Sequence, residues 1–265
     1  MNLSDFLARA VAVVVVALSG TIAKASDQDL ANKLANPISS LVSVPFQFNY
    51  DAGFGAADGE RLLLNIQPVV PIDITEDWNL ISRTILPVIY QDDVVPGTDQ
   101  FGLGDVVQSA FFSPKEPTNG IIWGVGPVAL IPTGTDSALG TGKFGLGPTA
   151  VALTQNGPLT VGFLANHIWS VAGEGNRSDV NSTFLQPFIN YSLPTATSFF
   201  LNTETTYDWT SSQASVPLNF GVNQIIDISG QKVQLGLGGR YWIDAPSNGP
   251  EGFGARLNVV FLFPK

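Results

Sequence analysis

The sequence has no cysteine and a single histidine, and these two absences exclude several kinds of site. Without cysteine there are no disulfides and no thiolate metal sites. A zinc site needs several nitrogen or sulfur ligands, which His167 alone does not provide. The sequence therefore predicts no metal and no cofactor.

Charged residues are also scarce. They make up 13% of the 265 residues, against about 25% in an ordinary soluble domain. The net charge is −10, which argues against a nucleic-acid partner. Hydrophobic residues reach 45%, and 27 glycines and 18 prolines supply many turns.

Long apolar runs are missing as well. No run reaches the roughly 18 residues that a membrane helix needs. The longest, Ala10 to Leu18, precedes an A-x-A pattern at Ala23–Ala25. This order predicts a secretory signal peptide over residues 1–25, cleaved near Ala25. A short amphipathic or buried helix is the alternative.

Residues 26–40 form a short segment after the predicted cleavage site. Ser26 to Leu34 has the pattern of one helix, and Asn36-Pro37 ends it. This helix is expected either in the periplasm or in the mouth of the domain that follows.

Residues 41–265 alternate between apolar and polar positions. In the last stretch, Phe253, Leu257 and Phe261 share one face, while Arg256 and Asn258 lie on the other. Twelve such stretches are expected near residues 42–50, 61–70, 78–90, 101–112, 121–133, 143–155, 159–171, 181–193, 198–209, 215–227, 233–243 and 253–263. Asp51 to Gly59 is expected to be a loop, and a bulge is expected near Asp105, where the alternation is imperfect.

The fold class predicted from this pattern is all-β. A soluble sandwich would alternate in the same way, but its strands are usually about 5–6 residues long. Strands of about 9–11 residues cross a bilayer at a tilt. An even number of strands, with aromatic residues at both ends of the apolar rows, is typical of a bacterial outer-membrane barrel. We therefore expect a transmembrane antiparallel β-barrel in the outer membrane. Its expected partners are membrane lipids, the barrel-assembly machinery and small-molecule permeants.

Several motifs resemble a known family. The chain is similar to the bacterial outer-membrane proteins labelled for the meta-pathway of phenol degradation, often called transporters. The matching stretches are Asn36 to Phe46, Gly102 to Asp105, Ile131 to Gly134, Leu139 to Pro148, Gln186 to Tyr191 and Phe261 to Lys265. The resemblance implies a channel or transporter for small molecules, including hydrophobic or aromatic compounds, and it implies no catalytic residues.

Polar residues on the inward rows are the candidate site. A basic wall facing an acidic wall would form a constriction whose transverse field orients solutes and sets ion selectivity. The alternative is an ion-pair network that fills the lumen and only stabilises it. The candidate lumen residues are Arg61, Arg83, Asp105, Glu204, Asp208, Arg240, Trp242 and Arg256.

An enzyme is the second hypothesis for function. A lipid-acting hydrolase would need His167 to face a serine near the outer interface. The sequence has no G-x-S-x-G motif, and His167 shares its row with Phe163 and Trp169, which indicates a lipid-facing residue. The sequence therefore favours a non-enzyme. The third hypothesis is a closed structural barrel.

Overall fold

The computed structural model describes residues 25–264, with side chains from Asp27 onward. The predicted signal peptide lies outside these residues apart from Ala25, the first residue of helix α2. The elements are α2 (Ala25–Leu34), β1 (Val42–Phe54), the 3-10 turn η1 (Gly55–Ala57), β2 (Gly59–Ile66), β3 (Val69–Asp73), β4 (Trp78–Asp92), β5 (Asp99–Leu103), β6 (Val106–Pro114), β7 (Ile121–Ile131), β8 (Lys143–Asn156), β9 (Leu159–Gly173), β10 (Asn181–Ser192), β11 (Thr197–Thr203), β12 (Thr205–Asp208), β13 (Gln213–Ile228), β14 (Gln231–Asp244) and β15 (Phe253–Phe263).

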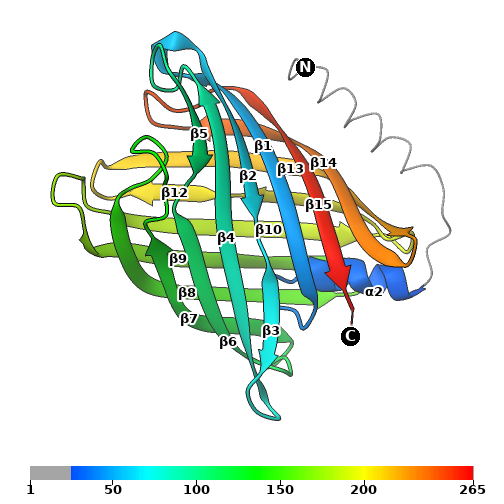
Figure 1. The fold of residues 1–265 in the computed structure, drawn as a ribbon. Helices are drawn as coiled ribbons and strands as arrows, with labels where there is room; N and C mark the ends of the chain where they lie inside the picture. Colours follow the sequence, from blue (N-terminus) through cyan, green and yellow to red (C-terminus); the bar gives the residue numbers. More distant parts are fainter. Residues whose placement is uncertain (1–24, 265) are drawn as a thin grey trace.

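These strands form one closed antiparallel barrel (Figure 1). The last strand, β15, pairs with β1 from Val42↔Phe263 to Tyr50↔Ala255, which closes the sheet on itself. Three barrel strands are each broken into two segments, β2 with β3, β5 with β6 and β11 with β12, so the fifteen segments make twelve barrel strands. The predicted twelve-stranded barrel is confirmed.

Two local expectations can be compared with the strand bounds. The break between β5 and β6 falls at Gly104-Asp105, where the sequence alternation was imperfect. The expected loop from Asp51 to Gly59 is wrong at both ends, because β1 continues to Phe54 and β2 begins at Gly59. Asp51 pairs with Arg61 on β2 and therefore belongs to the barrel wall.

The two faces of the wall have opposite chemistry. Large apolar side chains are exposed on the outside, among them Val125, Phe163 and Leu201. Buried polar side chains such as Asn49 and Asn219 are on the inside. A soluble domain would bury the first set and expose the second, whereas a lipid-embedded barrel has this arrangement.

Turns divide the barrel into two ends. The end where β1 begins and β15 finishes carries the turns at residues 74–77, 115–120, 157–158, 193–196 and 229–230, and we call it the terminal end. The opposite end, which we call the loop end, carries longer connections, at residues 132–142, 174–180 and 245–252. Short connections on one side and longer ones on the other are typical of outer-membrane barrels.

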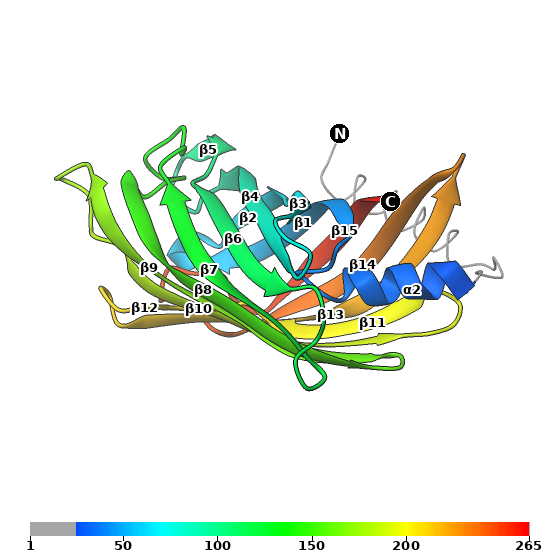
Figure 2. The same cartoon turned by 90° about the horizontal axis from the view of Figure 1, so that it is seen from below.

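Helix α2 lies in the mouth of the terminal end (Figures 1 and 2). Its Leu30 and Ala31 pack against inward residues of the wall, Ile225 and Val260. Polar contacts hold it as well. Lys232 on β14 forms an ion pair with Asp27 at 2.9 Å, and Gln155 Nε2 on β8 donates to the Asn32 carbonyl at 2.8 Å. Of the two expected positions, the helix therefore occupies the barrel mouth.

No helix within residues 25–264 is long and apolar enough to span a membrane.

The chain after α2 enters the barrel further. Ile38 is buried in a cluster with Ile81 on β4, Phe111 on β6, Val151 on β8 and Leu164 on β9. This residue therefore ties the N-terminal segment to the walls around it. Tight packing of this kind makes the loss of methylene groups costly.

Replacing Ile38 by alanine should lower the free energy of unfolding by about 2–5 kcal/mol, since a cavity would remain among these apolar side chains. Urea unfolding of the refolded protein in detergent measures this change. Ile74→Ala is the matched control, because Ile74 is exposed in a turn at the same end. Equal stability of the two variants would contradict the described packing.

Candidate functional site: a charged network across the lumen

The inward rows of neighbouring strands place charged side chains at similar heights. Asn49 on β1 is directly opposite Arg256 on β15, and Gly254 on β15 is opposite Arg240 on β14. A Cβ atom at Gly254 would lie 3.0 Å from Asp51 Oδ1. Because glycine leaves this space empty, Asp51 and Arg240 can meet across β15.

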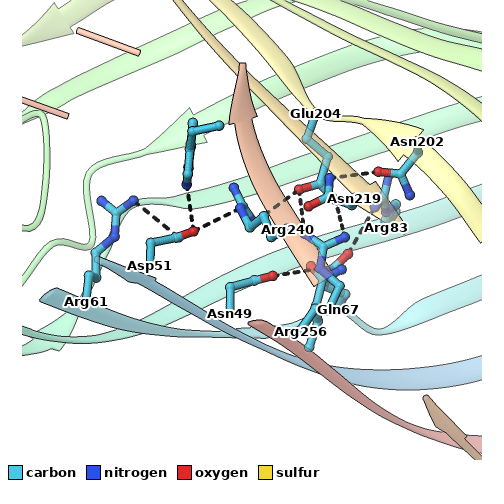
Figure 3. A network of polar contacts seen from close by, with 12 residues as sticks. Asn49, Asp51, Arg61, Gln67, Arg83, Asn202, Glu204, Asn219, Arg240 and Arg256 are labelled. Atoms are coloured by element: carbon cyan, nitrogen blue, oxygen red, sulfur yellow. Dashed lines mark hydrogen bonds and ion pairs between the residues drawn. The ribbon is translucent and has the colours of Figure 1, made fainter. Parts of the chain in front are cut away.

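Arg256 is the centre of the network (Figure 3). Its Nη1 and Nη2 atoms donate to the two carboxylate oxygens of Glu204 at 3.0 and 2.7 Å, and its Nε donates to Asn49 Oδ1 at 2.7 Å. The side chain is only 2% exposed. A bidentate, charge-assisted pair of this kind is the strongest hydrogen-bonding arrangement between protein side chains.

Glu204 reaches this pair from another part of the wall. It lies between β11 and β12, and β13 and β14 separate it from β15 in the sheet order. Its carboxylate also lies 3.6 Å from Nη1 of Arg240. Glu204 therefore joins strands that are not neighbours, and the contact passes through the interior of the barrel.

Asp51 is the second acidic residue of the network and is fully buried. Its Oδ1 accepts a hydrogen bond from Trp242 Nε1 at 2.8 Å and lies 3.1 Å from Arg240 Nε, an ion pair without hydrogen-bond geometry. Its Oδ2 lies 4.0 Å from Arg61 Nη2. The Arg240 guanidinium also lies 4.8 Å from the centre of the Trp242 ring, which adds a cation–π contact.

Arg83 extends the network toward the terminal end. Its Nη2 donates to Gln67 Oε1 at 3.0 Å, and Gln67 Nε2 donates to Gln47 Oε1 at 2.9 Å. Asn219 and Asn202, on the opposite wall, are joined by a further hydrogen bond at 2.9 Å (Figure 3). We call the charged set Arg61, Arg83, Arg240, Arg256, Asp51 and Glu204 the lumen network.

The charges in the lumen network do not balance. Four guanidinium groups meet two carboxylates, which leaves a surplus of two positive charges. The whole chain has a net charge of −10, so the interior has the opposite sign to the molecule. A positive interior attracts anions and repels cations.

The structure brings together six of the predicted lumen residues: Arg61, Arg83, Glu204, Arg240, Trp242 and Arg256. Two others lie elsewhere. Asp208 accepts hydrogen bonds from Thr210 and Ser211 in the turn after β12. Asp105 accepts hydrogen bonds from the loop between β7 and β8.

Sequence reasoning missed Asn49, Asp51 and Gln67 as members of the site. Asn49 and Asp51 continue the inward row that passes through Gln47, and that alternation was the available signal. Asp51 was not recognised as a lumen residue because it was assigned to a loop.

Asp105 fixes the long connection between β7 and β8. Its Oδ1 accepts from the Gly134 N–H at 3.0 Å, and its Oδ2 accepts from the N–H and hydroxyl of Thr141, both at 2.6 Å. Arg177, in the next loop, donates to the carbonyl of Ser137 at 2.7 Å. Two charged side chains therefore hold residues 132–142 to the loop end of the barrel.

Lys143 and Asp179 strengthen the same region with an ion pair at 3.0 Å. The hydrogen bond from Lys143, together with one from Ser170, lowers the pKa of Asp179 from its ordinary value. Asp179 therefore remains charged in mildly acidic solution.

His167 lies on the outward row of β9, between aromatic side chains. Its Nδ1 is 2.7 Å from Thr183 Oγ1, and its ring centre is 4.1 Å from that of Trp169. Trp209 Nε1 donates to the same Thr183 oxygen at 2.9 Å. Nε2 of His167 has no hydrogen-bond partner among residues 27–264. The hydroxyl that contacts His167 is that of a threonine and not of the serine that a hydrolase would need. Among residues 27–264, no third group binds the other ring nitrogen to orient the imidazole, as a catalytic triad requires.

Comparison with solved structures bears on the fold. An outer membrane channel from Pseudomonas putida F1 superposes with a TM-score of 0.64 at 17% identity, over 84% of this chain and 94% of that chain. The chain has the fold of an outer-membrane channel. The NanC porin gives a TM-score of 0.49 at 12% identity, over 83% of this chain and 98% of the porin.

An outer membrane phospholipase from Salmonella typhi, solved as a dimer with bound calcium, gives a TM-score of 0.46 at 10% identity, over 84% of this chain and 91% of that one. No protein-family model and no curated protein matches the sequence. The resemblance to the meta-pathway family therefore stays a prediction.

Neutralising Glu204 with glutamine should lower the free energy of unfolding by about 3 kcal/mol, since Arg256 and Arg240 would lose their shared buried counter-ion. Urea unfolding in detergent measures the change. Glu116→Gln removes an exposed carboxylate near a turn and should have little effect. A Glu204 variant as stable as the control would show that the ion pairs do not hold the interior together.

Asp105→Asn should loosen residues 132–142, because each charge-assisted bond to a backbone N–H contributes about 1.5–3 kcal/mol. We expect faster protease cleavage in this loop, measured on the folded barrel in detergent. Asp136→Asn is the control, since Asp136 lies in the same loop and only caps the Ala138 N–H. Equal cleavage rates would contradict the anchoring role.

Proposed function

We propose that this protein is an outer-membrane channel through which small molecules diffuse passively. The single observation that carries the proposal is a barrel with an apolar exterior and a charged network across its interior. A lipid-facing outside needs only apolar side chains, so buried charges inside are retained for a role in the lumen. The shared fold with an outer membrane channel agrees with this proposal.

The proposed orientation follows from the two ends. The terminal end, with the short turns and α2, faces the periplasm, and the loop end faces outward. Membrane lipids surround the apolar exterior, and the barrel-assembly machinery inserts the chain. Signal-peptide cleavage near Ala25 belongs to the same proposal.

The lumen network is proposed to act as the constriction. Its four arginines project from β14, β15, β2 and β4, which with β1 form one continuous arc of the wall, and Glu204 faces them from the junction of β11 and β12. The surplus of two positive charges favours anions over cations. The family resemblance further predicts that hydrophobic or aromatic compounds pass through the same lumen.

The alternative, in which the network is purely structural, makes a different claim about conduction. Direct contacts such as Arg256 to Glu204 close the distance between non-neighbouring strands and stabilise the barrel in either case. A constriction also sets ion selectivity, whereas a plug does not. Conduction measurements on charge variants therefore separate the two.

The refolded barrel in a planar bilayer, under a salt gradient, should give discrete current steps with a reversal potential that reports anion preference. Arg83→Ala combined with Arg240→Ala removes the positive surplus, so the reversal potential should move toward zero. Lys33→Ala combined with Lys115→Ala removes two cations that lie outside the lumen network and should leave it unchanged.

Two outcomes would overturn the proposal. A demonstrably folded wild-type barrel that carries no current would remove the channel. Current with the same reversal potential in the double arginine variant would leave a channel but reject the network as its selectivity filter.

A further inference from the structure

A cavity on the terminal side of the lumen network shares Arg83 with it. It has a volume of about 170 Å³ and lies between the N-terminal segment and the barrel wall, partly open to the lumen. Leu34 and Asn36 of that segment form one side, and Arg83, Gln234 and Val260 of the wall form the other.

Arg83 is the one charged residue among those that line the cavity. Its guanidinium donates to the neutral amide of Gln67, as Figure 3 shows. Within residues 27–264, no carboxylate lies at ion-pair distance from Arg83, and the nearby Glu204 forms its ion pairs with Arg256 and Arg240. No acid lines the cavity itself, and Glu204 acts on the Arg83 charge only from beyond ion-pair distance.

Two buried polar side chains face the same space. Ser43 on β1 is 5% exposed and Gln234 on β14 is 7% exposed, and both line the cavity. In the described part of the chain, neither side chain makes a hydrogen bond. The polar atoms of both side chains are not fully buried, so they can form hydrogen bonds with an occupant of the cavity.

The rest of the lining is apolar. Leu34 from the helix, Val69 from β3 and Val260 from β15 face the cavity. A hydrated inorganic ion would leave this surface in contact with water. An occupant with a short apolar body would cover it, and burial of that body would add to the binding free energy.

We propose that this cavity binds small monocarboxylates with an apolar body. The carboxylate accepts hydrogen bonds from Arg83 and from the side chains of Gln234 and Ser43, and the body of the ligand packs on Leu34, Val69 and Val260. The volume limits the ligand to a short chain or a single ring. This inference rests on the proposed function, because it names the class of permeant that pauses on the periplasmic side of the constriction.

Calorimetric titration of the refolded barrel in detergent tests the site with three probes at constant chloride concentration. Sodium butyrate and sodium benzoate carry the proposed features, and butyramide has the same body as butyrate without its charge. We expect saturable binding of the carboxylates and binding of butyramide that is at least about tenfold weaker, as for the loss of a charge-assisted hydrogen bond. Inorganic phosphate, tested alone, should bind more weakly than butyrate.

Variants separate the charge from the space. Arg83→Gln should weaken butyrate binding about tenfold or more while keeping a side chain of similar length. Ser43→Leu keeps the charge and fills the cavity, so it should also abolish binding. Lys115→Gln removes a cation outside the cavity and is the control. Each variant is first shown to be folded by its heat-dependent electrophoretic mobility.

Several results would overturn the inference. They are the absence of butyrate binding to the folded wild-type barrel, equal binding of butyrate and butyramide, phosphate binding tighter than butyrate, or unchanged binding in Arg83→Gln or in Ser43→Leu. A barrel that conducts ions but binds no carboxylate would refute the site and leave the channel. A barrel that binds butyrate but conducts nothing would refute the channel and leave the binding site.

Discussion

A polar side chain on the inner row of a closed barrel has to find its partner inside the lumen. The pairing of β1 with β15 imposes this constraint, because it leaves the sheet without an open edge. Arg256 meets the constraint most completely, with Glu204 and Asn49 binding its guanidinium. The Glu204 contact also ties the junction of β11 and β12 to β15, although β13 and β14 lie between them in the sheet.

The positive surplus follows from the same arrangement. Asp51 and Glu204 each contact two arginines, so two carboxylates are shared among the arginines and their negative charge does not balance the positive charge. The interior is therefore held together by ion pairs and still presents uncompensated guanidinium charge. Stability and selectivity have a common origin here, and a change to either carboxylate is expected to alter both.

Much of the fold could be predicted from the sequence, because alternation with period two is a local property of each strand. The row through Phe253, Leu257 and Phe261 sufficed to identify the closing strand. The site was harder to predict. Arg240 and Arg256 could be placed on one face, but their contact with Glu204 depends on the curvature of the closed barrel. The position of α2 likewise depends on apolar contacts with several distant strands. Asp51 was missed because a glycine-rich stretch follows it and looks like a loop.

A double-mutant cycle on Arg256 and Glu204 tests the central claim most directly. Arg256→Gln, Glu204→Gln and the combined variant would be unfolded in urea under identical conditions. We predict a coupling free energy above about 1 kcal/mol, within the range for residues in direct contact. Effects that add within about 0.3–0.5 kcal/mol, as for independent sites, would contradict a network that joins the two sides of the lumen.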